Sequence, residues 1–328
     1  MQSIGDLAQS FLLRRGAARL EAETTRLGQA LTTGLAPDIA AATGGDTRAI
    51  AALSRDLTLA DTYDRAAVEM GLRAAGAQAA LGAISGRLST LTGQTATLTG
   101  AASPQALDAL SSEGRNAFLG AIGDLNTAVA GHSVFAGTRV DAPAVISGDA
   151  ILGKLRALTA GMTTAGDIGA AIDGYFGPGG EFSTADYRGS PAPAPAIAIA
   201  QGQRAAIGLT ADDPALRSGL AAAAKLALLD DASQAARAAL AIDARADLMP
   251  AERAITGLRG RLGATEAQID AARASTAARR HALESERNAR IGVDPYETAT
   301  RLQQAMAQLD TLHAVTARLS RLSLVNHL

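Results

Sequence analysis

The chain has 328 residues, a net charge of −2 and no cysteine. The near-neutral charge argues against a strongly basic protein that binds nucleic acid or an anionic membrane, and the missing cysteines exclude disulfides, thiolate metal sites and cysteine nucleophiles. Hydrophobic residues make up 48 % of the chain and aromatic residues only 3 %; because much of the apolar total is alanine and leucine, which favour helices, we predict long, thin helical packing.

The first forty residues predict an amphipathic helix. Leu13, Leu20 and Leu27 follow one another at seven-residue spacing, which is typical of a coiled-coil seam. The residues Thr32–Gly34 and then Pro37 predict the end of this helix, and the loop is expected to continue to residue 45.

Two further helices are expected before residue 131. Asp46 can cap a helix whose apolar stripe continues to Leu98. Ser103 and Pro104 then form a good N-cap and first helical position for a helix that carries apolar residues as far as Val129.

The middle of the chain has a different character. Short helices are plausible over residues 151–158 and 168–176, and residues 196–200 and 204–210 predict two short strands around a turn. Four of the nine aromatic residues crowd into this part, and we interpret them as the core of a β-rich excursion: Tyr175, Phe176, Phe182 and Tyr187.

The last third predicts helices again. Asp213 and Pro214 can start a helix that runs to about Pro250, and a longer helix with apolar residues at strict seven-residue spacing follows. Asp294 with Glu297 three residues later is a capping box for a final helix. Three glycines in the long helix predict close contact with another helix: Gly257, Gly260 and Gly263.

Patterns typical of enzymes are weak. Gly131–Gly137 contains Ser133 between glycines, but Phe135 occupies the position where a nucleophile elbow needs glycine. The four histidines have no metal-ligand spacing, and no phosphate-binding loop is present. We therefore expect no catalysis, no cofactor and no metal. The only lysines are Lys154 and Lys225, which we interpret as a coding bias towards arginine.

Several segments together resemble one family. Residues 300–328 resemble the C-terminal helix of the flagellar hook-associated protein 3 family, the hook–filament junction proteins of the flagellin superfamily. Leu31–Gly34 matches the turn after the first helix of that superfamily. Three internal segments look like its further signatures: Ser133–Thr138, Tyr187–Ser190 and Ala211–Pro214.

The resemblance implies a mainly α fold: an elongated flagellin-like helical bundle and coiled coil, built from the N- and C-terminal regions, with a small β-rich insertion. Residues 1–45 and 291–328 would form the terminal coiled-coil domain used in assembly. Residues 46–176 and 211–290 would form a helical bundle, and residues 177–210 the outer insertion.

An apolar stripe at each chain end needs a partner, because isolated helices are marginal in water. We therefore predict a helical homo-oligomer whose subunit contacts lie at the chain ends: Leu7, Phe11, Leu20, Leu27, Leu302, Leu309, Leu312, Leu319, Leu322, Leu324 and Leu328.

The resemblance further implies a subunit of the extracellular flagellum that lies between the preceding hook-associated protein and flagellin, with a cytoplasmic export chaperone as a partner and no nucleic acid or membrane. The first residues lack the charge order of a secretory signal, so we expect export without a cleavable signal. A minor flagellin is the alternative, and a coiled-coil secretion or signalling scaffold a more distant one. The sequence Leu322–Leu328 suits the junction protein better than the filament protein.

Overall fold

The structure is a computed structural model that describes residues 4–98 and 102–325, with side chains described from 8 to 98 and from 102 to 319. It divides into two compact units. Unit 1 combines both chain ends, up to Asp61 and from Ala277 onward, and unit 2 spans Thr62–Thr276. Within the described residues, no helix carries an apolar stretch long enough to cross a membrane.

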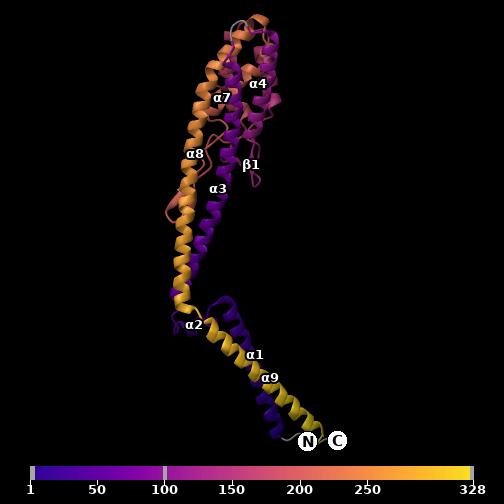
Figure 1. The fold of residues 1–328 in the computed structure, drawn as a ribbon, viewed down its shortest axis with the longest axis vertical. Helices are drawn as coiled ribbons and strands as arrows, with labels where there is room; N and C mark the ends of the chain where they lie inside the picture. Colours follow the sequence, from indigo (N-terminus) through magenta and orange to yellow (C-terminus); the bar gives the residue numbers. More distant parts are fainter. Residues whose placement is uncertain (1–3, 99–101, 326–328) are drawn as a thin grey trace. The chain divides into compact units, whose positions relative to one another are not determined.

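Unit 1 is built from the two terminal helices and the ends of two longer ones. α1 (Ile4–Thr33) and α9 (Pro295–Val325) lie side by side (Figure 1). α3 (Arg48–Thr95) begins in this unit and α8 (Gln234–Ile291) ends in it. The predicted end of the first helix is confirmed. The expected loop contains a short helix, α2 (Ile39–Ala42), because the carboxylate of Asp38 accepts the N–H of Ala41 at 2.9 Å.

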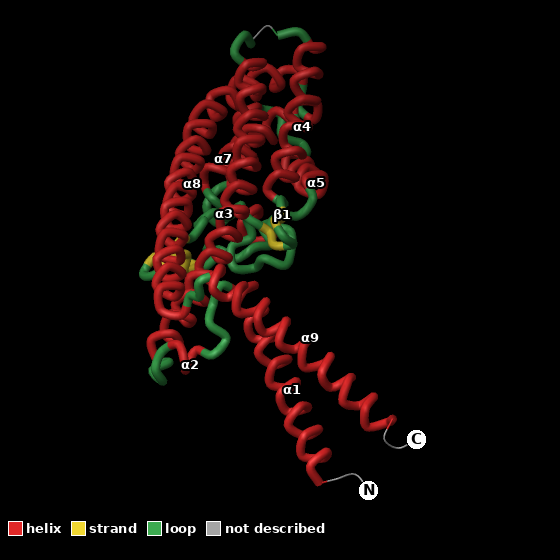
Figure 2. The backbone as a smooth tube through the Cα atoms, turned by 60° about the horizontal axis from the view of Figure 1, so that its bottom comes forward, coloured by secondary structure: helices red, strands yellow, loops and turns green. Residues whose placement is uncertain are grey.

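Unit 2 holds the rest of α3 and α8 together with four shorter helices, which pack around one core (Figure 2). The shorter helices are α4 (Pro104–Leu125), α5 (Gly148–Thr159), α6 (Ala165–Phe176) and α7 (Pro214–Ala227). A π-helix, η1 (Phe182–Asp186), follows α6, and a 3₁₀ turn, η2 (Leu229–Asp231), joins α7 to α8. The chain is mainly α, as predicted.

The strands of unit 2 are few and short. β1 (Ala128–Val129) pairs antiparallel with β2 (His132–Ser133), and β3 (Ile197–Ala200) with β4 (Gln203–Ala205). The predicted hairpin is confirmed at β3 and β4, but its second strand ends at Ala205 rather than at residue 210. Val129 was expected in a helix and lies in β1. α4 ends at Leu125, and Ala130 and Gly131, which have positive φ, form the tight turn between β1 and β2.

The aromatic residues of the middle segment are core residues, but they belong to the helical core of unit 2 and not to a separate β-rich core. Phe176 on α6 lies 5.2 Å from the rings of both Tyr175 and Phe182, and 6.3 Å from the ring of Phe118 on α4. Phe118 and Phe182 are fully buried. The expectation of a separate β-rich core was therefore wrong, because these side chains complete the packing of α4 and α6.

The predicted break at Pro250 was also wrong. α7 ends at Ala227, the chain turns through η2, and α8 then continues through Pro250 without interruption. A proline inside a helix removes one hydrogen bond and costs about 3 kcal/mol. The packing of α8 offsets this cost, since Leu248 and Ala251 on either side of the proline are buried.

Close helix contacts occur at glycines other than those predicted. A Cβ built on Gly257, Gly260 or Gly263 meets nothing within 4 Å. A Cβ on Gly114 of α4 would instead lie 2.8 Å from the backbone nitrogen of Ala227 at the end of α7. Glycine at position 114 therefore allows α4 and α7 to approach closely.

Candidate assembly site

The two chain ends form one helix pair, with both termini at the same end of it (Figure 1). Gly16 of α1 faces Leu312 of α9: a Cβ on Gly16 would lie 3.5 Å from Cδ2 of that leucine. Each helix thereby covers part of the apolar side of the other. Such packing supplies the stability that an isolated amphipathic helix lacks.

Most of the predicted interface leucines contribute to this pair. They are half-buried, as side chains between two helices should be: Leu20, Leu27, Leu302, Leu309, Leu312 and Leu319. The seven-residue spacing thus serves contacts between α1 and α9 of one chain.

Phe11 lies elsewhere on α1. It is 62 % exposed, and it precedes Gly16 by five residues, which places it about 140° around the helix. Leu12 is 66 % exposed. These two large apolar side chains are therefore left uncovered by α9. The side chains of Leu7, Leu322 and Leu324, and the whole of Leu328, lie outside the described part of the structure.

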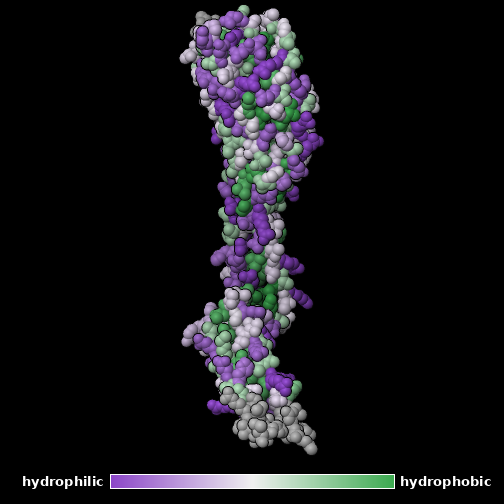
Figure 3. Space-filling view, turned by 90° about the vertical axis from the view of Figure 1, so that its right-hand side faces the viewer, coloured by the Kyte–Doolittle hydropathy of each residue, from purple (hydrophilic) through white to green (hydrophobic). Residues whose placement is uncertain are grey.

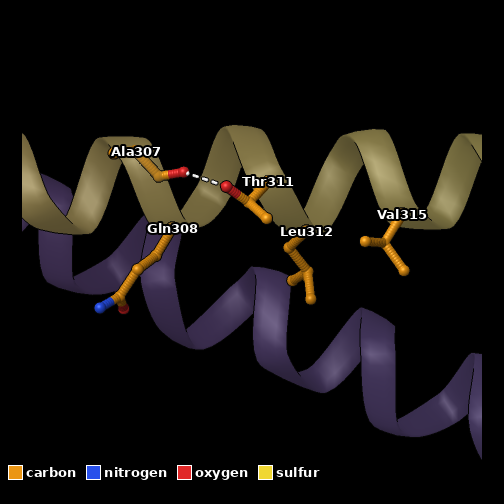
Figure 4. Close-up of a pocket in the computed structure, with 5 residues that line it drawn as sticks. All are labelled: Ala307, Gln308, Thr311, Leu312 and Val315. Carbon is orange, nitrogen blue, oxygen red and sulfur yellow. Dashed lines mark hydrogen bonds between the residues drawn. The ribbon is translucent and has the colours of Figure 1, made fainter.

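An open groove of about 340 Å³ runs along α9 (Figure 4). Its lining contains no charged side chain: Ala307, Gln308, Thr311, Leu312 and Val315. Leu312 points towards α1, and the hydroxyl of Thr311 donates to the carbonyl of Ala307 at 2.8 Å. Because that hydroxyl is already bonded to its own helix, the groove offers a mainly apolar surface.

Two alanines are the most buried described residues of the pair, and the sequence analysis missed them. Ala30 is 2 % exposed and Ala305 5 %. Each follows a seam leucine by three residues, so continuing the apolar periodicity through small residues would have found them. Met306 and Val315 stay 51 % and 42 % exposed, and Figure 3 shows hydrophobic side chains interspersed among hydrophilic ones along the terminal helices.

The turn after α1 pairs with the break between α8 and α9. The N–H of Val293 donates to the carbonyl of Gly34 at 3.0 Å, and the N–H of Ala36 donates to the carbonyl of Ile291 at 2.7 Å. Gly34 has a φ of +70°, which favours glycine. A small apolar cluster of unit 1 supports this turn: Ile50, Leu53 and Ile291.

The predicted capping box of α9 is half present. The carboxylate of Asp294 accepts the N–H groups of Tyr296 at 2.8 Å and Glu297 at 3.2 Å. The side chain of Glu297 pairs with Arg301 at 2.6 Å instead of returning to the cap. The carboxylate of Asp294 therefore caps α9, and the hydroxyl of Thr298 donates to the carbonyl of Asp294 at 2.7 Å.

Three segments that carry the family resemblance meet in unit 2. The N–H of Ser190 donates to the carbonyl of Ala136 at 2.9 Å, and the N–H of Ala211 donates to that of Phe135 at 2.8 Å. The hydroxyl of Tyr187 donates to the carbonyl of Ser190 at 2.8 Å. These bonds join the segments Ser133–Thr138, Tyr187–Ser190 and Ala211–Pro214. Three segments that are far apart in the sequence therefore meet at one junction of unit 2.

Lys225 is almost fully buried and holds three carboxylates. Its Nζ lies 2.9 Å from Asp173, 2.8 Å from Asp243 and 2.7 Å from Asp247. Burial by itself lowers the pKa of this lysine, but the three hydrogen bonds outweigh burial and raise the pKa above its ordinary value. The three carboxylates are close enough together to hold a metal ion, yet the ammonium already donates to each.

Lys154 has a similar role. Its Nζ lies 2.5 Å from the buried Asp186 and 2.8 Å from Glu181, and these bonds raise the pKa of the lysine. The hydroxyl of Tyr175 donates to the other oxygen of Asp186. Burial, followed by this bond, raises the pKa of Tyr175. Both lysines of the chain therefore act as structural cations between helices.

Ser133 and His132 are neighbours in β2, so their side chains leave opposite faces of the strand. Nδ1 of His132 lies 3.8 Å from Asp141. This geometry keeps the serine and the histidine from forming a nucleophile–base pair.

Comparisons with known proteins agree with the helical architecture. Residues 248–328, which include α9 and much of α8, match the family described as the bacterial flagellin C-terminal helical region. Among solved structures, a Vibrio parahaemolyticus protein described as a flagellar hook-associated protein has a similar fold, with a TM-score of 0.50 and 13 % identity. The similarity covers 72 % of this chain and 93 % of that one. A comparison with curated proteins finds none that matches.

The family match is confined to residues 248–328, and the similarity to the solved structure concerns the fold.

Proposed function

We propose that the chain is a structural subunit of the hook–filament junction of the bacterial flagellum and forms a platform on which flagellin polymerises. The observation that carries this proposal is the α1–α9 pair, which joins both chain ends and leaves apolar side chains exposed. The match of residues 248–328 to the flagellin C-terminal region supports it.

In this proposal, copies of the chain assemble through the terminal helices. Phe11, Leu12, Met306 and Val315 are exposed in a single chain, and contact with a neighbouring copy would remove them from water. A contact between different surfaces of successive copies repeats and gives a helical array when the rotation does not close. We propose that the residues predicted to form subunit contacts, from Leu7 to Leu328, contact a neighbouring copy in this array.

The remaining assignments belong to the same proposal. Residues 1–45 and 291–328 would form the inner assembly part, residues 46–176 and 211–290 the bundle, and residues 177–210 an outward insertion. The preceding hook-associated protein and flagellin would be the axial neighbours. A cytoplasmic chaperone would accompany export, which would need no cleavable signal.

The proposal is tested in cells that lack this chain. They are complemented with the full-length chain or with a variant lacking residues 1–40 and 300–328, and swimming and the amount of chain in the medium are measured. We expect the full-length chain to restore swimming and the shortened variant to fail. Equal swimming with the shortened variant, once its production is verified, would overturn the role of the terminal helices.

A minor flagellin is the second candidate. The observation that favours it is the match of residues 248–328 to the flagellin C-terminal region. Quantitative mass spectrometry of purified hook–basal-body–filament particles separates the two. A junction subunit should be a small fraction of the main filament protein, whereas a flagellin should be a major component. Absence from the particles, with retention in the cytoplasm, would instead favour the coiled-coil scaffold.

A further inference from the structure

We propose that a basic hollow of unit 2 receives two carboxylates, those of Glu266 and Asp270, from a second copy of the chain. The hollow has a volume of about 580 Å³. Its lining includes two arginines, Arg139 and Arg188, beside Asn126 and Ser147. The guanidinium of Arg139 donates to the backbone carbonyl of Arg188 at 2.9 Å, which holds this guanidinium against the backbone of the second arginine.

The positive charge of this hollow is not neutralised within the described part of the chain. Among the described residues, neither Arg139 nor Arg188 forms an ion pair. Asp186, two residues from Arg188, lies 2.5 Å from Lys154, and Asp141, two residues from Arg139, lies 3.8 Å from His132. Arg139 is close enough to Tyr187 to favour its phenolate electrostatically, although burial is the larger influence and raises the pKa of that tyrosine. The lining of the hollow contains no carboxylate, so an anion entering it would meet two guanidinium groups.

The side-chain amide of Asn126, which lines the hollow, already has its hydrogen-bond partners within the chain. The side-chain amide of Asn126 donates to the carbonyl of Val145 at 3.0 Å and accepts its N–H at 2.9 Å. This side chain is therefore occupied, and the arginines are the groups left for a ligand. Two guanidinium groups suit a ligand with two carboxylates close together.

α8 presents such a pair. Glu266 and Asp270 are four residues apart, which places their Cβ atoms about 6 Å from each other on one side of the helix. Asp270 is exposed and Glu266 half-buried, and among the described residues neither forms an ion pair with an arginine or lysine of its own chain. The two acidic and the two basic residues lie on different elements of unit 2. Because these are two different surfaces, one copy can contact the next head to tail, and this contact gives an array where the rotation does not close.

This inference rests on the proposed function, since it adds a second contact to the terminal helices. It is tested with the charge-reversed variant R139E/R188E in cells lacking the native chain, by measuring its amount in purified hook–basal-body particles. We expect about a tenfold or larger loss of incorporation, because like charges would then face each other. The variant E266R/D270R should show the same loss. The fourfold variant R139E/R188E/E266R/D270R should restore incorporation, because the attraction is rebuilt with opposite signs.

The matched control is R253E/R261E, which reverses two exposed arginines of α8 outside the hollow and should leave incorporation unchanged. Circular dichroism of each purified variant verifies that it folds. Unchanged incorporation of R139E/R188E would overturn the proposal. Loss in both double variants without rescue in the fourfold variant would overturn the second copy as the occupant. Absence of the unmodified chain from the particles would instead defeat the proposed function, so the two failures are distinguishable.

Discussion

The carbonyl oxygen of Ser190 occupies the space that a side chain at Gly137 would need. A Cβ built on Gly137 would lie 2.4 Å from this oxygen and 2.4 Å from that of Ala192, and the glycine has a φ of +61°. The junction that joins three distant segments of unit 2 therefore depends on a residue without a side chain.

We expect Gly137→Ala to destabilise unit 2 by about 2–4 kcal/mol, because the left-handed backbone and the clash with two carbonyls both oppose the new methyl group. Urea unfolding followed by circular dichroism measures the change in the free energy of unfolding. Gly260→Ala is the matched control. Its Cβ meets nothing within 4 Å inside α8, so it should stabilise the chain by about 0.5–1 kcal/mol. Equal effects of the two substitutions would contradict this account.

Lys225→Met should destabilise unit 2 by about 1–3 kcal/mol at neutral pH. It leaves the carboxylates of Asp173, Asp243 and Asp247 together without their cation, although these groups remain about half in water, which reduces the cost. Lowering the pH protonates the carboxylates and relieves their repulsion, so the difference between variant and parent should shrink in acid.

Arg115→Met provides the comparison for this lysine. It removes the exposed ion pair with Asp149, in which the two side chains are 40 % and 70 % exposed, and should cost no more than about 1 kcal/mol. The free energies of unfolding of both variants, measured at neutral and acidic pH, show whether the buried lysine contributes more stability than the exposed ion pair. A Lys225→Met variant that loses no more stability than Arg115→Met would show that the cluster contributes little.

Periodicity predicted the helices well because one face of each helix packs against a neighbour. The C-terminal ends of α1, α5 and α6 lie within one residue of the predicted ends. The starts of α5 and α6 lie three residues earlier than predicted, because the N-caps Ser147 and Thr164 were not recognised. The short helix α2 and the strand at Val129 were missed because each depends on a single turn. The break at η2 and the helical course through Pro250 depend on packing between distant elements, which no local rule contains.

The assembly site was only partly accessible from sequence. Seven-residue spacing identified Leu309 and the other half-buried leucines of α1 and α9 as apolar seam residues. The spacing could not tell a partner helix within the chain from a partner helix in another subunit. Ala30 and Ala305 were missed because small residues carry a weak hydropathy signal. The two lysines gave no signal beyond their rarity, since their partners come from elements far apart in the sequence.

Alkaline conditions should destabilise unit 2. Burial raises the pKa of Tyr187 to about 12 from an ordinary value of 10.0, so the folded state resists losing this proton more than the unfolded state does. The contribution is fully present below pH 10 and is lost as the pH rises from 10 towards 12. The raised pKa of Lys225 acts in the same direction. Because the pKa of Tyr175 is raised as well, the late rise of phenolate absorbance in a base titration should lose amplitude in Tyr187→Phe without disappearing. An unchanged late amplitude in that variant would contradict the assignment.

The terminal helix pair gives the most direct test of assembly. Leu312→Asp places a carboxylate opposite Gly16, between α1 and α9, and should separate the helices because a half-buried charge without a partner costs several kcal/mol. We expect faster proteolysis of the chain ends and loss of the variant from hook–basal-body particles. Gln308→Asp changes the same groove at an exposed position and should leave the pair intact. If Gln308→Asp keeps the ends resistant to protease and still blocks incorporation, the groove itself contacts a neighbouring subunit. Normal incorporation of Leu312→Asp would mean that assembly does not need the pair.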